Sequence, residues 1–365
     1  MKGRPSVARM MDIFEEMARR GHEQVIFNYD RTSGLKAIIA IHDTTLGPAL
    51  GGCRMLPYAT EEAALTDVLR LSEGMTYKAA AAGLDYGGGK TVVLGDPATD
   101  KSEALFRALG RFIDTLNGRY RTGEDVGTSE NDFVHSLRET RFLVGLPQAY
   151  GGSGDTGDNT ALGVMQAIRA GLMHRFGTTS LKGRRVVVQG LGKVGYHVAR
   201  RSVEEGADVI AADINPHVVG RVASELGLEP MDPWAVVETS CDVFSPCALG
   251  NVINAETVNK LECQIVAGSA NNQLEDDSLA DTLREKNILY APDFIANAGG
   301  LIQVANEIQG YNPERVKHQI ESIYDLLLAI FEEAERTHQS TMTVAMKHVR
   351  QRLVLVHDIR RIRTS

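Results

Sequence analysis

The spacing of apolar residues divides the chain into two regions with different rhythms. Before about residue 150, the stretches QVIFNY (24–29), LKAIIAIHD (35–43) and TVVL (91–94) predict strands. A helical period predicts one helix that begins near Thr60 and another that begins after Asp100 and stops at Asn117-Gly118. We expect Asp100 to be the N-cap of the second helix, with Glu103 in the capping-box position. Strands and helices therefore alternate in this region.

After residue 150 the chain changes to regular strand–helix units. The strands expected are RVVVQ (185–189), DVIAA (208–212), DVFSP (242–246), QIVAG (264–268) and ILYAP (288–292). A long helix is expected from Asn312-Pro313, since proline is well tolerated in a first turn. This pattern predicts an α/β protein with an N-terminal α/β domain and a C-terminal doubly wound, Rossmann-type domain.

The length of 365 residues also favours two domains. We place them at residues 1–148 and 149–332, and expect residues 333–365 to return to the first domain. The glycine-rich stretch YGGSGDTGDN (150–159) lies at the boundary. Its composition fits either a flexible linker or a hinge.

Charge and cysteine usage narrow the class of protein. The net charge of −8 argues against nucleic acid or an anionic membrane as the main partner. Neither a signal peptide nor a membrane-spanning apolar run is visible, so we expect a cytoplasmic protein. The four cysteines have no C-x-x-C spacing, which favours reduced thiols over disulfides or a metal site.

A dinucleotide-binding signature follows the first strand of the second region. The sequence QGLGKVG places Gly190, Gly192 and Gly195 after an apolar strand and before a helix, and Asp213 ends the next strand, 23 residues after Gly190. The three glycines allow a tight turn, close approach of a pyrophosphate, and close packing of helix on strand. Asp213 can accept hydrogen bonds from a ribose diol and would repel a 2′-phosphate. The pattern predicts NAD rather than NADP.

A second glycine-rich stretch, LDYGGGKTVVLGDP (84–97), precedes Lys90. It does not fit a phosphate-binding loop of the G-x-x-x-x-G-K type, because Leu84 stands where the first glycine should be and a strand, not a helix, follows the lysine. We expect the glycines to let the backbone pass close to a substrate at which Lys90 is aimed.

Lys78, Lys90 and Asp125 all lie among small residues. Two neighbouring lysines in a partly dry site disfavour each other's charge, so one could act as a general base well below pH ~10. A second, charged lysine could bind a carboxylate. With Asp125 for amine chemistry, this set suits an α-amino acid as substrate.

The chain resembles the amino-acid dehydrogenase family of leucine, valine and phenylalanine dehydrogenases, which are related to glutamate dehydrogenase. The matching stretches are LGPALGGCRM, GMTYKAAAAGLDYGGGKTVV, GRYRTGEDVGT, VQGLGKVG, CALG, AGSANNQL and APDFIANAGGLIQV. They cover roughly residues 20–335 in order, and the segment after about residue 340 resembles the family less.

The resemblance implies roles for individual residues. Lys90 would activate the attacking water, Asp125 would exchange protons with the substrate nitrogen, and Lys78 would bind the substrate carboxylate. Other implied substrate contacts are Gly51, Gly52 and Asn271, with a side-chain pocket lined by Leu50, Gly123 and Leu301. Implied cofactor contacts are Gly190, Leu191, Gly192, Lys193, Val194, Gly195, Asp213, Thr156, Thr160, Ala248 and Asn297.

The resemblance also implies the reaction, a reversible NAD-dependent oxidative deamination of an L-amino acid, and a homo-oligomer. Leucine-selective members usually carry Ala and Val where this chain has Gly123 and Leu301, so L-phenylalanine is the expected substrate. Leucine, valine or tryptophan are the alternatives. Two other classes are a phosphate-transferring enzyme, disfavoured by the spacing at Lys90, and a non-catalytic NAD-binding sensor, disfavoured by the presence of Lys78, Lys90 and Asp125 together.

Overall fold

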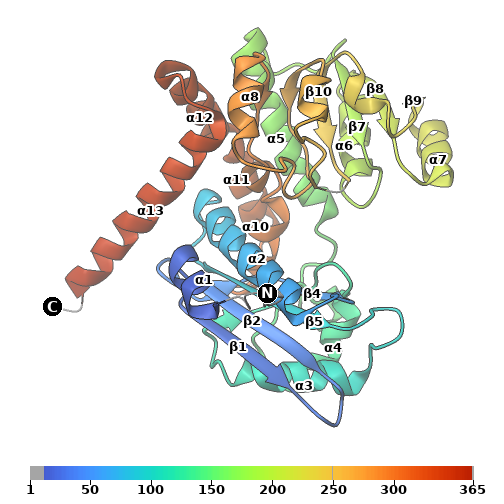
Figure 1. Cartoon of the computed structure of the whole chain (residues 1–365). Helices are drawn as coiled ribbons and strands as arrows, with labels where there is room; N and C mark the ends of the chain where they lie inside the picture. Colours follow the sequence, from blue (N-terminus) through green and yellow to red (C-terminus); the bar gives the residue numbers. More distant parts are fainter. Residues whose placement is uncertain (1–11, 249, 364–365) are drawn as a thin grey trace, which may run out of the picture. The chain divides into compact units, whose positions relative to one another are not determined.

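The structure, a computed structural model, describes residues 12–248 and 250–363, with only the backbone of residues 360–363. The chain forms two compact units (Figure 1). The first ends at Gly151 and omits residues 77–84, which belong in the second unit with the described residues from Gly152 to Arg363. The boundary therefore lies three residues beyond the expected one. Of the segment 333–365, the described residues 333–363 belong to the second unit, whereas we expected the segment to return to the first.

The first unit is built on one six-stranded sheet. Its strands are β1 (Gln24–Tyr29), β2 (Lys36–Asp43), β3 (Ala49–Leu50), β4 (Cys53–Leu56), β5 (Gly87–Leu94) and β6 (Tyr120–Arg121), in the order β1-β2-β5-β3-β6, with β4 also on β5. Strands β1, β2 and β5 are antiparallel, while β3 and β4 run parallel to β5. Its helices are α1 (Ile13–Arg20), α2 (Glu61–Ala81), α3 (Glu103–Asp114) and α4 (Glu130–Ser136), and residues 148–150 form a 3₁₀ turn.

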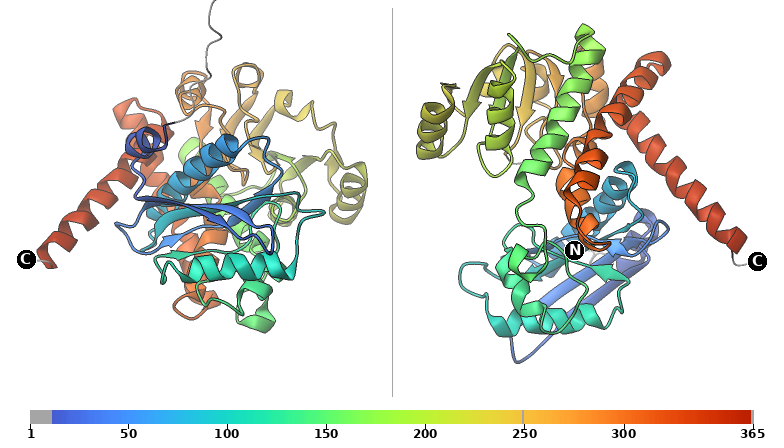
Figure 2. Two further views of the ribbon diagram at one scale, coloured as in Figure 1. Left: turned by 60° about the horizontal axis from the view of Figure 1, so that its bottom comes forward. Right: turned by 180° about the vertical axis from the view of Figure 1, so that it is seen from behind.

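Both faces of this sheet are covered, α2 lying on one and α3 on the other (Figure 2). Successive residues of β2 explain the arrangement, because a strand alternates its side chains between the two faces. Ile39 and Ile41 pack with the α3 stripe, whereas Ile38 packs with the stripe of α2. The uninterrupted apolar run of β2 is therefore a strand buried on both sides.

Two local predictions for this unit need correction. Helix α3 begins after Ser102, whose side chain accepts a hydrogen bond from Leu105 N at 3.1 Å, so Ser102 and not Asp100 is the N-cap. Asp100 instead accepts from Asp96 N at 2.8 Å in the preceding turn. Strand β5 also begins four residues earlier than TVVL, because the three glycines are part of it.

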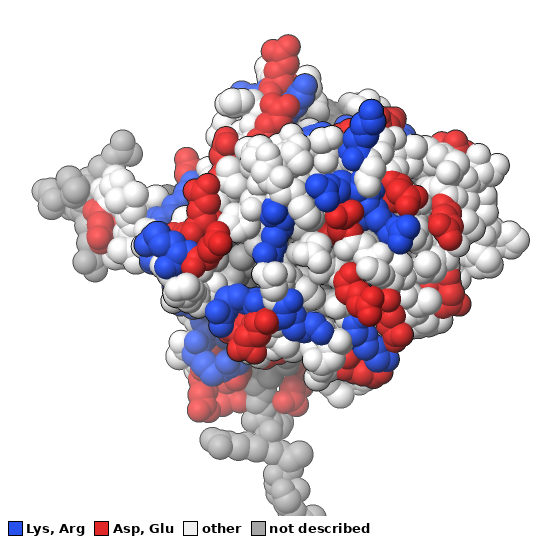
Figure 3. Space-filling view, turned by 90° about the horizontal axis from the view of Figure 1, so that it is seen from above, with Lys and Arg blue, Asp and Glu red and all other residues white. Residues whose placement is uncertain are grey.

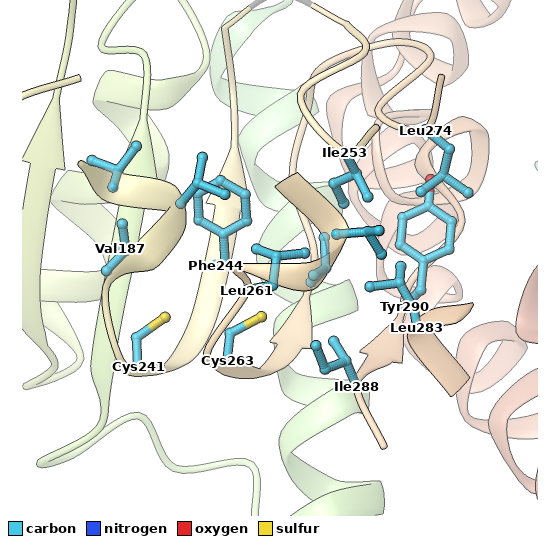
Figure 4. Close-up of a cluster of buried hydrophobic side chains, with 14 of the residues drawn as sticks. Val187, Cys241, Phe244, Ile253, Leu261, Cys263, Leu274, Leu283, Ile288 and Tyr290 are labelled. Atoms are coloured by element: carbon cyan, nitrogen blue, oxygen red, sulfur yellow. The ribbon is translucent and has the colours of Figure 1, made fainter. Parts of the chain in front are cut away.

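The second unit contains a parallel sheet in the order β12-β11-β10-β7-β8-β9. The strands are β7 (Arg185–Gln189), β8 (Asp208–Ala212), β9 (Glu229–Pro230), β10 (Cys241–Pro246), β11 (Cys263–Val266) and β12 (Leu289–Tyr290). All five predicted strands are confirmed, and the order reverses direction at β7 as in a doubly wound fold. Figure 4 shows the apolar cluster on one face, with Val187, Phe244 and Tyr290 from three different strands.

Helices flank this sheet and continue to Arg363. They are α5 (Gly157–Phe176), α6 (Gly195–Glu204), α7 (Pro216–Leu226), α8 (Leu279–Glu285), α9 (Asp293–Ala296), α10 (Gly299–Glu307), α11 (Pro313–Glu321), α12 (Ile323–Thr337) and α13 (Thr341–Arg363), with 3₁₀ turns at 236–238 and 257–259. The long helix expected from Asn312-Pro313 is divided at Ser322 into α11 and α12. Its expected apolar face is nevertheless buried throughout, from Val316 to Phe331.

The glycine-rich stretch at the boundary is tied to the second unit. Gln303, which is 1 % exposed, donates from Nε2 to the Ser153 hydroxyl at 3.0 Å and accepts from Asn159 Nδ2 at 2.7 Å. Glu307 accepts from Ser153 N at 2.7 Å. Residues from 157 onward form the first turn of α5. The residues just before Ser153 are also ordered by hydrogen bonds, since Gly151 N donates to Gln148 O at 3.0 Å at the end of the 3₁₀ turn.

One face of the molecule carries charges of both signs. In the face seen in Figure 3, acidic and basic side chains are interspersed and neither sign forms a broad area. Within the described residues, every helix is too short or too polar to cross a membrane.

Candidate functional site

The first unit buries a lysine–aspartate ion pair. Lys90 lies in the middle of β5 and is 6 % exposed, and its Nζ contacts Asp125 Oδ2 from the loop after β6. Burial alone would raise the pKa of Asp125, but the Lys90 ammonium and the Arg54 guanidinium outweigh it and lower that pKa to about 2. A buried cation is stable in such a place only with a partner of this kind. Two predicted catalytic residues are thus brought together.

The three glycines before Lys90 pack against protein atoms. A Cβ on Gly87 would lie 2.0 Å from Asp43 O, and one on Gly88 would lie 2.1 Å from Thr76 Oγ1 and 2.4 Å from Ser72 O. A Cβ on Gly89 would lie 2.7 Å from the Tyr120 ring. The expectation that these glycines let the backbone pass close to a substrate stays a prediction, but the space at their Cβ positions is filled by protein atoms. The glycines let β5 lie directly against α2 and β6, which holds Lys90 on a tightly packed strand.

Gly51 and Gly52 of LGGC also allow close packing, next to the ion pair. A Cβ on Gly51 would lie 1.8 Å from Gly89 O, and one on Gly52 would lie 2.9 Å from Asp125 Cβ. Gly51 and Gly52 join β3 to β4 and bring that turn against Lys90's strand and against Asp125. The missing Cβ of Gly123 faces Val144 O at 2.4 Å, and Leu50 is 1 % exposed. Gly123 thus provides a close backbone approach between its loop and residue 144.

Sequence reasoning missed three polar residues beside this pair. Arg54 Nε lies 3.4 Å from Asp125 Oδ2, and Arg54 NH1 lies 3.1 Å from Asp67 Oδ2 on α2. Tyr58 donates its hydroxyl to the same Asp67 oxygen at 2.7 Å. The arginine of the GGCRM stretch was the available signal, because a cation two residues after Gly52 lies on the short strand that adjoins Asp125.

The second unit brings together Lys78, Asn271 and Asn297. Lys78, near the end of α2, donates to Asn271 Oδ1 at 3.1 Å, and Asn297 Nδ2 donates to the same oxygen at 3.0 Å. Arg352 of α13 donates to Ala80 O at 2.7 Å and so binds the carbonyl end of the helix that carries Lys78. The described tail therefore contacts this end of α2.

The turn that carries Asn271 is held by a buried carboxylate. Asp293 accepts hydrogen bonds from Gln273 N at 3.0 Å and Phe294 N at 2.7 Å, and burial raises its pKa. Asp293 was not singled out from the sequence. Its place at the start of the short helix α9, four residues before Asn297, fixes both sides of the Asn271–Asn297 contact.

The glycine loop after β7 has the form that the sequence predicted. Gly190 has a φ of +93°, and a Cβ on Gly195 would lie 1.9 Å from Gly190 O. Around Gly192 the Cβ position has nothing within 4 Å. One glycine therefore makes the turn, one packs helix on strand, and the middle one faces open space. Leu191 is buried, whereas Lys193 and Ala248 are exposed and Val194 precedes α6 without a side-chain cap.

Asp213 reaches back to this loop. Its Oδ2 accepts from Leu191 N at 2.8 Å, and its Oδ1 accepts from Asn215 N at 2.8 Å. A carboxylate has further lone pairs for a diol. The carboxylate is therefore fixed at the end of β8 with acceptor capacity to spare.

Thr156 and Thr160 lie against the start of α10. A Cβ on Gly300 would lie 2.8 Å from Thr160 Oγ1 and 3.3 Å from Thr156 Cβ. Leu301 follows and is 8 % exposed. The threonines, Asn297 and Leu301 therefore belong to one neighbourhood of the second unit.

These observations fit a dinucleotide. The open space at Gly192 and the uncapped N-terminus of α6 suit a pyrophosphate, which backbone N–H groups bind well. The carboxylate of Asp213 suits a ribose. The Asn297 Oδ1 atom is buried without a partner among the described atoms, so it could accept a hydrogen bond from a ligand amide.

Comparison with known proteins gives consistent matches over the chain. Residues 22–142 match the family model "Glu/Leu/Phe/Val dehydrogenase, dimerisation domain", and residues 151–229 and 217–358 match "Glutamate/Leucine/Phenylalanine/Valine dehydrogenase". The second match extends to residue 358, through most of α13. We expected the resemblance to weaken after about residue 340, and this expectation is wrong.

Individual relatives cover nearly the whole chain. A phenylalanine dehydrogenase of Thermoactinomyces intermedius is 50 % identical over 355 residues, 97 % of each chain. A leucine dehydrogenase of Bacillus cereus is 48 % identical over 350 residues, 96 % of each chain. The crystal structure of L-tryptophan dehydrogenase from Nostoc punctiforme matches with a TM-score of 0.82 and 43 % identity, covering 94 % of this chain and 99 % of that one.

Proposed function

Because the chain belongs to the glutamate/leucine/phenylalanine/valine dehydrogenase family, we propose that it catalyses the NAD-dependent oxidative deamination of an L-amino acid. The amino acid, NAD and water would give the 2-oxo acid, ammonium, NADH and a proton. The observation that carries the proposal is the buried pair of Lys90 and Asp125. A non-catalytic sensor of NAD would have no need of a lysine held in this way.

The residues of the first unit suit the hydrolytic half of the reaction. A bound nicotinamide would supply the hydride acceptor at the α-carbon. Lys90, after losing its proton, would accept a proton from the water that attacks the resulting imine. Asp125 would exchange protons with the substrate nitrogen. Both side chains lie on tightly packed backbone, so they are positioned before the substrate arrives.

The second unit would hold the substrate carboxylate and the cofactor. Lys78 can bind a carboxylate by its charge. Asn271 Oδ1 accepts hydrogen bonds from both Lys78 and Asn297 and so holds the two side chains together. Gly190, Gly192 and Gly195 support a dinucleotide cofactor. Asp213 supports NAD over NADP, because its carboxylate would repel a 2′-phosphate.

L-Phenylalanine is the substrate that we propose, with leucine, valine and tryptophan as alternatives. Support comes from the pair Gly123 and Leu301, and from phenylalanine dehydrogenases among the relatives. Relatives named for leucine and tryptophan are of similar identity. The physical support is modest, since the missing Cβ of Gly123 faces Val144 O.

The test is NADH formation at alkaline pH with each of the twenty L-amino acids, and with NADP in place of NAD. Alkaline pH is used because Lys90 must lose its proton to act as a base. Phenylalanine should give the highest kcat/KM and NADP little turnover. Turnover with none of the amino acids would contradict the proposed function, and a tenfold preference for leucine or valine would contradict the substrate.

We also propose that the protein is a homo-oligomer. Strand β1 is an edge strand, and Phe27 and Tyr29 on it are 56 % and 64 % exposed. Exposed aromatic residues on a free sheet edge favour association with another copy. Light scattering of the purified protein should give a mass that is a multiple of 39.7 kDa. Phe27→Lys should reduce that mass, and a monomeric parent would contradict the proposal.

A further inference from the structure

We propose that Arg54 is a positioning residue for the deamination, which keeps the Asp125 carboxylate ionised when Lys90 gives up its proton. The inference rests on the proposed function, because it presupposes that Lys90 is the base and Asp125 its partner. It concerns a residue that touches neither substrate nor cofactor in our account and acts through Asp125.

The geometry places Arg54 between two carboxylates. Its Nε lies 3.4 Å from Asp125 Oδ2, and its NH1 lies 3.1 Å from Asp67 Oδ2. The three side chains are 17 %, 21 % and 15 % exposed, for Arg54, Asp125 and Asp67 in that order. Asp67 is fixed in turn by the Tyr58 hydroxyl at 2.7 Å. Arg54 is therefore held at both ends, by α2 and by the loop after β6.

Asp125 needs a second cation beside it because Lys90 loses its positive charge when it acts as a base. When Lys90 is neutral, a largely buried Asp125 would lose its ion-pair partner, and a buried carboxylate without a cation tends to take up a proton. A guanidinium remains charged at any working pH. Arg54 therefore allows Lys90 to be neutral and Asp125 to be ionised at the same time, the combination that the proposed chemistry uses.

The remaining titratable groups around the pair do not replace this charge. Burial raises the pKa of the Cys53 thiol on β4 and of the Tyr120 phenol on β6, so both stay neutral. Burial, with the hydrogen bond to Asp67, also raises the pKa of Tyr58. Among the described residues nearby, Lys101 pairs with Asp132 at 2.7 Å and Arg70 with Asp67 at 3.1 Å. Glu124 accepts a hydrogen bond from Glu130 N at 3.0 Å.

The experiment measures kcat/KM against pH for Arg54→Gln and for a matched control, Arg70→Gln. Both changes remove one positive charge beside Asp67, but only Arg54 reaches Asp125. Without Arg54, protonated Lys90 is favoured, so the rise of activity with pH should move up by about half a pH unit or more. Arg54→Lys should restore the position of this rise, and Arg70→Gln should leave it in place.

Asp67→Asn should shift the pH dependence in the opposite direction, and it tests the inference even if Arg54→Gln does not fold. It removes a negative charge that competes for Arg54, so the rise of kcat/KM with pH should move to lower pH. The inference would be overturned if Arg54→Gln lost the same share of activity at every pH. If Arg54→Gln does not fold, it would be overturned by Asp67→Asn showing the same rise of kcat/KM with pH as the parent.

A readout without turnover separates this inference from the proposed function. Only the neutral amine of a lysine reacts with acetic anhydride, so the rate at which Lys90 is modified, measured by peptide mass against the exposed Lys317, follows the charge of Lys90 as pH changes. Its pH dependence should move in Arg54→Gln even if no amino acid is oxidised. If the parent is inactive with all amino acids but this shift is seen, only the proposed function fails.

Discussion

Two glycine-rich stretches in this chain end in a lysine, and they serve opposite purposes. In Gly87–Lys90 all three glycines lie against protein atoms and the lysine is 6 % exposed. In Gly190–Lys193 the second glycine, Gly192, has nothing within 4 Å of its Cβ position, and the lysine side chain is 71 % exposed. The first stretch holds Lys90 by packing. The second leaves the backbone at Gly192 open.

The difference shows what glycine alone can indicate. Both stretches place glycines before a lysine, as GGGK at 87–90 and GLGK at 190–193. The space left by a missing Cβ can be filled by the protein or left open to a ligand, and only the fold decides which. The variants described below replace the two lysines and one glycine from each stretch, then test the carboxylates Asp125 and Asp213, and finally change the expected side-chain pocket. They are given in order of decreasing expected effect.

The largest difference in kcat should be between variants of Lys90 and Lys193. Lys90→Ala removes the proposed base, so kcat should fall by about 10²–10⁴-fold while the Kd for NAD is unchanged. Lys193→Ala removes an exposed charge near the loop, so kcat should stay within a few-fold and only NAD affinity should weaken. Steady-state kinetics and NADH fluorescence titration measure both. Near-normal turnover by Lys90→Ala would refute the role of Lys90.

The two central glycines should separate stability from binding. In Gly88→Ala the new methyl group would lie 2.1–2.4 Å from Thr76 and Ser72, so unfolding free energy should fall by about 1–3 kcal/mol or more. Gly192→Ala meets no protein atom, so its stability should match the parent while the Kd for NAD rises. Urea unfolding and NADH titration test the pair, and a stability loss of similar size in both variants would contradict the contrast.

The sequence predicted the second unit well because its elements follow general rules. Parallel strands read as short apolar runs, and the three roles of Gly190, Gly192 and Gly195 depend on a spacing of a few residues. The first unit was predicted less well in detail. Gly88 faces α2, and Arg54 faces both Asp67 and Asp125, so their partners are 12 to 71 residues away in sequence. Sequence spacing carries no signal for such contacts.

The domain boundaries show the same limit. The glycine-rich stretch marked the division to within a few residues, but Gln303 holds part of it to the second unit. The assignment of residues 77–84 to that unit also depends on contacts such as Arg352 with Ala80. Neither could be read from local composition.

The Asp125 carboxylate should leave a signature in acid. Its pKa of about 2 lies below the unfolded value of ~3.9, so its ionised form stabilises the fold above about pH 4, and this contribution is lost as pH falls through 2. The expected contribution is of order 2 kcal/mol. In Asp125→Asn, unfolding free energy should fall less steeply between pH 4 and 2 than in the parent. Parallel curves for the two proteins would contradict the ion pair.

Asp213 should control the choice of cofactor more than the stability of the loop. Asp213→Asn keeps an oxygen that can accept from Leu191 N but removes the negative charge, so the preference for NAD over NADP should narrow by about tenfold. Asp213→Ala should narrow it further and also loosen the loop. The ratio of kcat/KM values for NAD and NADP measures the effect. An unchanged ratio in both variants would show that Asp213 does not face the ribose.

The smallest expected effect concerns substrate size, and the two candidate positions are unequal. Gly123→Ala would bring a methyl group to 2.4 Å from Val144 O, so it should disturb the backbone rather than simply narrow a pocket. Leu301→Val is the cleaner test, because it removes one methylene from a side chain that is 8 % exposed on α10. Pockets discriminate by about 1–3 kcal/mol for each methylene, so the ratio of kcat/KM for phenylalanine to that for leucine should change by roughly tenfold. The change should favour branched side chains, as expected from the valine of leucine-selective relatives. If the ratio is the same in Leu301→Val and the parent, Leu301 does not line the side-chain pocket, and the case for phenylalanine would depend on the relatives alone.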